Sequence, residues 1–191
     1  MKIDIANLEE KIKSGNLVQA DWGRPNEERC CLMSALAGYS KRECTANGWP
    51  KWLTELFVLL FDAAPDDKFI EWGRELARAA QYGHSRDADW HEIFKAIRME
   101  SILPIAMKAI GEGEEKWRRE GRAGIQRAID ENGRAINTEY VLGTSSASLA
   151  ALGTEEAGAF WAASATDGGP AAKAAAIKEI YESTIKILNQ A

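Results

Sequence analysis

Apolar residues recur along this chain at steps of three and four positions, which is the spacing of amphipathic helices. The first predicted helix, 4–14, has Asp4 as its capping residue and Gly15 at its end. Alternation of apolar and polar residues, the pattern of a half-buried strand, occurs only at NTEYVL, 137–142. The pattern therefore predicts an all-α fold, a bundle of eight to ten helices.

The most apolar segment is WLTELFVLLF, from Trp52 to Phe61. A helix that is apolar almost all round belongs in the centre of a domain, so we expect 50–63 to be the core helix, with Pro50 in its first turn. Its most buried residues should be Leu56, Phe57, Leu60 and Phe61. Other helices are predicted at 27–37, 66–82, 89–102 with a kink or restart at Pro104, 114–133 and 170–189.

The two parts of the chain differ in the size of their core residues. Large side chains dominate before Gly111, whereas thirteen alanines lie between Ala147 and Ala176. Alanine faces let helices approach closely. We therefore expect an N-terminal helical bundle, 1–110, and an alanine-rich C-terminal helical layer, 111–191, packed together as one domain. The final helix should dock on its own chain, which favours a monomer; a homodimer is the alternative.

Composition narrows the class of protein. The chain has 191 residues, with 24 Lys and Arg against 29 Asp and Glu, so its net charge is −5, which disfavours a general nucleic-acid binder. Three cysteines without CxxC spacing exclude a zinc ribbon and a disulfide framework. No signal peptide or membrane span is apparent, so we expect a cytoplasmic protein.

The two histidines bracket an acidic stretch, HSRDADWHE. Within it, His84, Asp87 and His91 offer nitrogen and oxygen ligands for a divalent metal. The spacing matches no established metal motif, and a solvated turn explains the residues more simply. We expect no metal and no cofactor.

The densest basic run lies in the predicted helix 114–133. Arg118, Arg119 and Arg122 share one flank, opposite an apolar flank that includes Ile125. Such a stripe binds phosphates or an acidic partner, or is simply a solvated face. A nucleic-acid module using 116–127 is therefore one alternative function.

Two of the seven tryptophans, Trp22 and Trp49, lie in predicted loops. Tryptophan is enriched in recognition surfaces, so these two are candidate binding residues. Burial under a loop is the competing interpretation.

The segment CTANGWPKWL, 44–53, followed by LFD at 60–62 and by alanine-rich helices, resembles a group of uncharacterised helical proteins of bacteria and their phages. The resemblance implies a phage or mobile-element origin. It also implies binding to a host protein, for example to inhibit a defence system.

No nucleophile elbow or phosphate-binding glycine loop is present in the sequence. We therefore expect a non-enzymatic interaction protein with a protein partner. The alternative is a small-molecule-binding protein or enzyme with a pocket between the helical layers.

Overall fold

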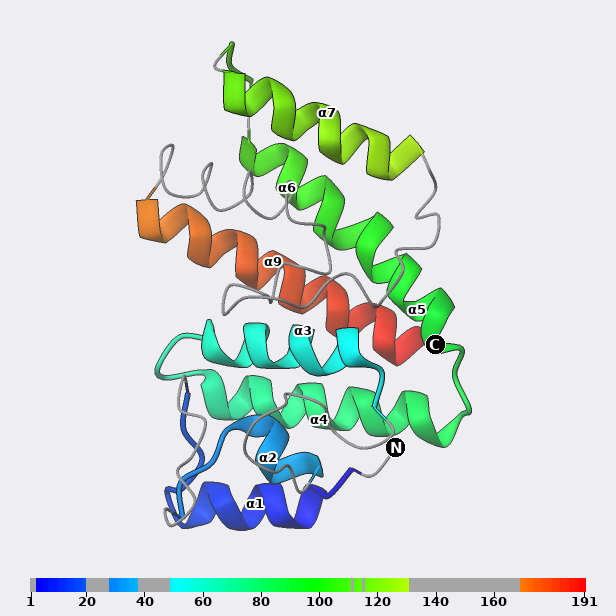
Figure 1. Ribbon diagram of the computed structural model, residues 1–191. Helices are drawn as coiled ribbons and strands as arrows, with labels where there is room; N and C mark the ends of the chain where they lie inside the picture. The colour runs from blue at the N-terminus through cyan, green and yellow to red at the C-terminus, as the bar shows by residue number, and fades with distance from the viewer. Residues whose placement is uncertain (1–2, 20–27, 38–48, 111, 115, 131–168) are drawn as a thin grey trace. The chain divides into compact units, whose positions relative to one another are not determined.

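The computed structural model describes residues 3–19, 28–37, 49–110, 112–114, 116–130 and 169–191, and its helices are drawn in Figure 1. The fold is all-α, as predicted, and within the described ranges the sole β-type pairing is an isolated bridge between Leu17 and Cys30. In chain order the elements are α1 (Ile5–Lys13), α2 (Leu32–Ala37), α3 (Lys51–Asp62), α4 (Phe69–Ser85), α5 (Trp90–Ile97), a π-helical turn (Arg98–Ile102), α6 (Leu103–Ile110), α7 (Lys116–Asp130) and α9 (Gly169–Gln190).

The expected number of helices was too high for the part of the chain that is described. The elements α5, the π-helical turn and α6 run on without a break, and α2 has only six residues. Six longer helices therefore remain, rather than eight to ten. Most of the alanine-rich segment between Ala147 and Ala176 lies outside the described residues.

Helical structure continues through Pro104, so the helix does not restart there, whereas the kink stays a prediction. The N–H of Leu103 donates to the carbonyl of Arg98, five residues back, so the helix is one residue wider just before the proline. A proline removes one helical hydrogen bond and its ring crowds the carbonyl four residues earlier. The π-helical turn gives that ring room, and α6 continues directly.

Contacts between Cα atoms divide the chain into two compact units. Unit 1 comprises residues 1–90 and 188–191, and unit 2 comprises residues 91–187. The sequence predicted a different division, into an N-terminal bundle, 1–110, and a C-terminal layer, 111–191, and that division stays a prediction.

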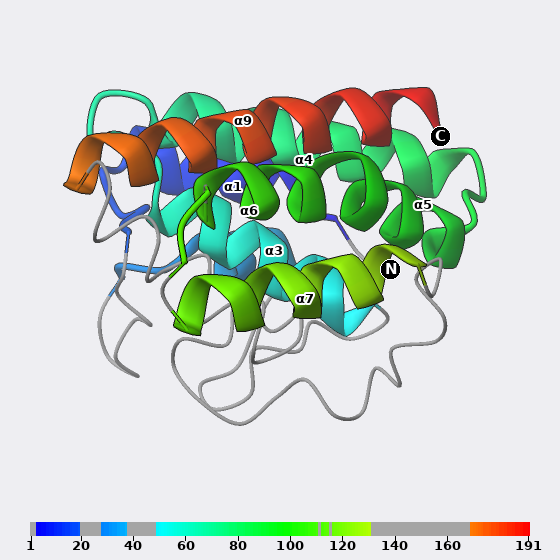
Figure 2. The same cartoon turned by 90° about the horizontal axis from the view of Figure 1, so that it is seen from above.

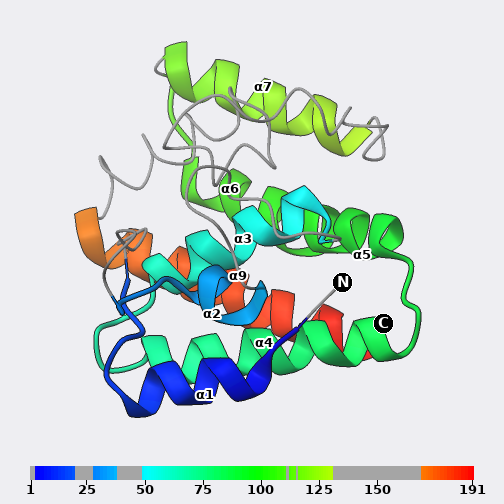
Figure 3. The same cartoon turned by 60° about the horizontal axis from the view of Figure 1, so that its bottom comes forward.

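In unit 1, α3 packs against α2 and α4, and α1 packs against both of these helices, as Figure 3 shows from below. The predicted core of α3 is confirmed: Leu56 is 2% exposed, and Phe57, Leu60 and Phe61 are fully buried. Gly73 of α4 allows the close approach of α3, because a Cβ atom there would lie 3.1 Å from the Phe61 ring. The burial of these large apolar side chains is the main stabilising contribution to unit 1.

Local signals set the ends of α1 as predicted. The side chain of Asp4 accepts a hydrogen bond from the Asn7 amide, and Gly15 adopts a positive φ of 70° just after the helix. Glycine is favoured there because it carries no Cβ atom.

The helix expected at 27–37 begins only at Leu32. Its preceding residues are held in a different conformation, because the amide of Cys30 donates to the carbonyl of Asn16 and the amide of Val18 donates to the carbonyl of Cys30. These bonds join segments far apart in sequence, so a local pattern does not reveal them.

Three other helices begin slightly later than predicted. Pro50 is the N-cap of α3 rather than its first residue. The start of α4 is Phe69 because the preceding residues form a turn. Helix α7 begins at Lys116 rather than at 114, and residues 131–133 of the predicted helix lie outside the described residues.

In unit 2, α6 lies between α7 and α9, as Figures 1 and 2 both show. Nζ of Lys108 on α6 is 3.4 Å from the carboxylate of Glu179 on α9. The apolar stripe of α9 is buried within the single chain, with Ile177 at 3% and Ile180 at 1% exposure. This agrees with the expectation that the final helix is ordered against its own chain, whereas the monomeric state stays a prediction.

Candidate functional site

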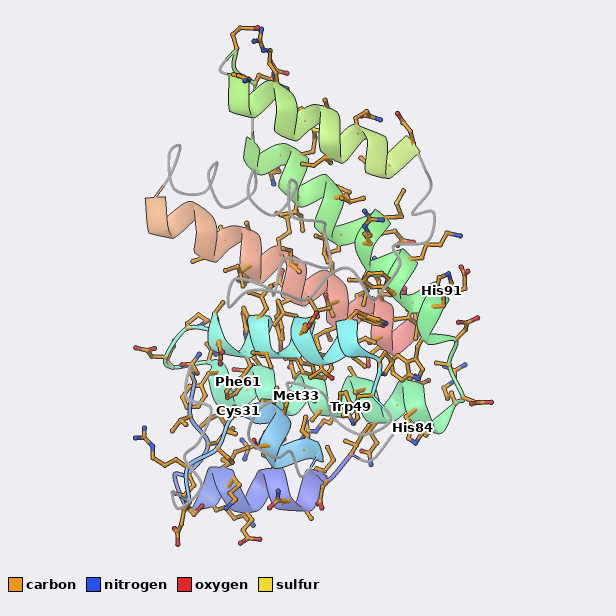
Figure 4. The ribbon with its side chains drawn as sticks, in the orientation of Figure 1. Cys31, Met33, Trp49, Phe61, His84 and His91 are labelled. Atoms are coloured by element: carbon orange, nitrogen blue, oxygen red, sulfur yellow. The ribbon has the colours of Figure 1, made fainter. Side chains whose placement is uncertain are left out.

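Of the two candidate recognition tryptophans, Trp49 belongs to the core. Its ring meets Phe57 edge to face, with the ring centroids 5.7 Å apart, and the residue is only 7% exposed. Figure 4 marks its position at the start of α3. Trp49 therefore offers no exposed recognition surface, because the apolar face of α3 buries it. Trp22 lies outside the described residues.

The three candidate arginines of α7 have different environments. Ile125 is fully buried and Arg119 is exposed, which agrees with the predicted apolar and basic flanks. Arg122 is half-buried, and its Nη2 donates to the carbonyl oxygen of Gly113 at 2.7 Å. Arg122 thus holds the segment that leads into α7. The side chain of Arg118 lies outside the described part.

The predicted alternative metal ligands His84, Asp87 and His91 are all exposed. Asp87 has a positive φ of 55° in the turn after α4, and the two histidines are labelled in Figure 4. Over the described residues, no group of three His, Cys, Asp or Glu side chains is placed to hold a metal ion. These three residues therefore form no metal site in this structure.

Unit 2 buries several polar side chains. Arg98 and Ser101 lie on the π-helical turn and Thr184 on α9, and they are 6%, 0% and 0% exposed. Among the residues that the structure describes, the hydroxyls of Ser101 and Thr184 have no hydrogen-bond partner, which is costly for a buried polar group.

The surface of α4 carries a feature that our sequence interpretation missed. Tyr82 is 44% exposed, and within the described ranges it is the one large hydrophobic residue that is exposed. Its hydroxyl accepts a hydrogen bond of 2.8 Å from Nη1 of Arg86, whose guanidinium carbon is 5.1 Å from the ring centroid. We name Arg78, Tyr82 and Arg86 the α4 face, since they follow one another at four-residue spacing along one side of α4 and its end, where Arg86 is the C-cap residue.

The signal for this face was present in the sequence. The apolar stripe of α4 follows Trp72, Leu76 and Ala80, and Tyr82 lies well away from it on a helical projection. An aromatic residue off the buried stripe, with an arginine one turn before and one turn after, indicates an exposed aromatic flanked by charge.

No helix in the described part is both long enough and apolar enough to cross a membrane. Comparison of the chain with protein-family models, with curated proteins and with solved structures found no match. The resemblance to bacterial and phage proteins therefore stays a prediction.

Proposed function

We propose that this chain is a non-enzymatic interaction protein that binds another protein through the α4 face. The observation that carries the proposal is the exposed pair of Tyr82 and Arg86, whose side chains are already held together on the surface. Tyrosine and arginine are among the residues that contribute most to binding at protein interfaces.

Two physical properties favour this pair as a binding surface. The tyrosine ring supplies contact area at little cost in side-chain entropy, because it has two rotatable bonds. The hydrogen bond and ring contact hold the Arg86 side chain before a partner arrives, which lowers the entropy lost on binding.

The buried face of the same helix supports the exposed one. Leu76, Ala77 and Ala80 are fully buried, so α4 is fixed against the core of unit 1. On the side of α1, Nε and Nη2 of Arg74 each donate to one carboxylate oxygen of Glu9, both at 2.7 Å. A rigid helix presents surface side chains in a defined arrangement.

The expected partner is a host protein, and the expected compartment is the cytoplasm. Both expectations come from the sequence and its resemblance, and the host partner remains part of the proposal. The alanine-rich C-terminal layer likewise stays a prediction, because residues 131–168, which include much of its alanine-rich segment, lie outside the described residues.

Affinity capture followed by reconstitution tests the proposal. The full chain is immobilised and used to capture proteins from a lysate of the cells that naturally make it. Each captured protein is then purified and mixed with the chain, and light scattering measures the mass of the complex. The proposal predicts a stoichiometric complex that Tyr82→Ala together with Arg86→Ala weakens.

The control variant is Lys178→Ala on α9. Lys178 is exposed and its ion pair with Glu182 is a surface contact within the same helix, so the change should leave both fold and binding intact. Failure to reconstitute any stoichiometric complex, or equal binding by the double variant and the control, would contradict the proposal.

A further inference from the structure

The charged residues on either side of Tyr82 indicate the kind of partner that the α4 face binds. This inference rests on the proposed function. From Leu76 to Arg86 the chain contains two arginines and no acidic residue, although the whole chain carries a net charge of −5. Arg78, Tyr82 and Arg86 are all exposed. Acidic residues flank this stretch, with Glu75 before it and Asp87 and Asp89 after it, so the positive charge is confined to the two arginines of the α4 face.

The two arginines retain charge that a partner can use. Among the residues that the structure describes, Arg86 bonds only to the neutral Tyr82, and Arg78 forms neither a hydrogen bond nor an ion pair. The carboxylate of Glu9 is hydrogen-bonded to Arg74, and this bond is the largest cause of the lowered pKa of Glu9. The positive charge of Arg78 also lowers the pKa of Glu9, but by less.

Helix stability explains only part of this arrangement. Arg86 lies at the carboxyl end of α4, where a positive charge interacts favourably with the helix dipole. That interaction does not account for the exposure of Tyr82, nor for Arg78, which lies two turns earlier and beyond the reach of the last turn.

We infer that the α4 face recognises an acidic segment of the partner protein, with Tyr82 contacting an apolar or aromatic side chain between two carboxylates. Arg78 and Arg86 are two turns apart, about 12 Å along the helix axis. An extended segment advances about 3.3 Å per residue, so the two carboxylates should be roughly four residues apart. Arginine suits this role because its planar guanidinium binds a carboxylate through two parallel hydrogen bonds.

A displayed library of random peptides, selected on the full chain, tests the inference without knowledge of the partner. The enriched peptides should carry two Asp or Glu residues about four positions apart, with an apolar residue between them. One such peptide, made with a fluorescent label, is then titrated with each variant and followed by fluorescence anisotropy.

The α4 variants Arg78→Glu and Tyr82→Ala should each weaken binding roughly tenfold or more, and the peptide should dissociate as salt is raised. Tyr82→Phe should bind much better than Tyr82→Ala, since it keeps the ring. The matched control is Arg119→Glu on α7, which makes the same change of charge at another exposed arginine and should alter the affinity less than about twofold. Circular dichroism and melting temperature check that each variant is folded.

Three results would overturn the inference: enrichment of peptides without acidic residues, an acidic peptide that binds Arg78→Glu as well as the unchanged chain, or tighter binding of a labelled single-stranded DNA than of any selected peptide. Suppose instead that a reconstituted partner binds Arg78→Glu as tightly as the unchanged chain but binds Tyr82→Ala more weakly. That result would overturn the recognition of an acidic segment and leave the proposed binding through the α4 face intact. If the chain captures no partner protein, the proposed function is contradicted instead.

Discussion

The helices α4 and α7 each carry several arginines, some of which are hydrogen-bonded within the fold and some of which are exposed. On α4, Arg74 is bonded to Glu9, whereas Arg78 and Arg86 stay available at the surface. On α7, Arg122 is bonded to the Gly113 carbonyl and Arg119 is exposed. The comparison teaches that a dense basic run in the sequence does not identify a binding surface, because some of its arginines hold the fold.

The largest expected effect concerns the core that fixes α4. Phe57 is fully buried and touches the Trp49 ring, so Phe57→Ala should cost about 3–5 kcal/mol of unfolding free energy through lost burial and a cavity. Chemical denaturation measures this. A loss below about 1 kcal/mol would mean that α3 is not the core on which α4 rests.

The next effect separates the two arginines of α7. Arg122→Ala removes the hydrogen bond to Gly113 and should destabilise the protein by about 0.5–1.5 kcal/mol, whereas Arg119→Ala should cost almost nothing. Thermal melts of the two variants provide the comparison. Equal melting temperatures would remove the distinction between a structural and an available arginine on this helix.

The smallest effect concerns the pair that links α1 to α4. The hydrogen bond from Arg74 holds the pKa of Glu9 below its ordinary value. Because the folded-state pKa is lowered, the pair stabilises the protein above the ordinary carboxyl pKa of about 4.3 and loses this contribution as the pH falls through the lower, folded-state value. Both side chains are about one-third exposed, so the contribution should be below about 1 kcal/mol.

Denaturation as a function of pH, with Glu9→Gln as the comparison, measures that contribution. The free energies of unfolding of the two proteins should differ at neutral pH and converge in acid. A constant difference across this range would show that the stability of α4 does not depend on the ionised pair.

Sequence alone was sufficient where the determining signals are local. The cap at Asp4, the end of α1 at Gly15 and the apolar run of α3 each act within a few residues, and each was predicted. The exposed Arg119 and buried Ile125 follow from helical spacing in the same way.

The predictions that went wrong depend on contacts between distant residues. The start of α2 is displaced by the bridge from Cys30 to Leu17. The sequence left Trp49 open between burial and an exposed recognition role, and its packing on Phe57 of α3 decides for burial. The bond from Arg122 to Gly113 distinguishes two arginines that are alike on a helical projection. None of these partners is indicated by spacing along the chain.

Matched charge reversal on the two helices tests the central claim most directly. Arg86→Glu on α4 and Arg119→Glu on α7 change the net charge equally, so any difference in affinity for the reconstituted partner reports the position of the binding surface. Titration calorimetry should show a loss of roughly tenfold or more for Arg86→Glu and less than about twofold for Arg119→Glu. Normal binding by Arg86→Glu, with a large loss for Arg119→Glu, would place the surface on α7 and contradict the account.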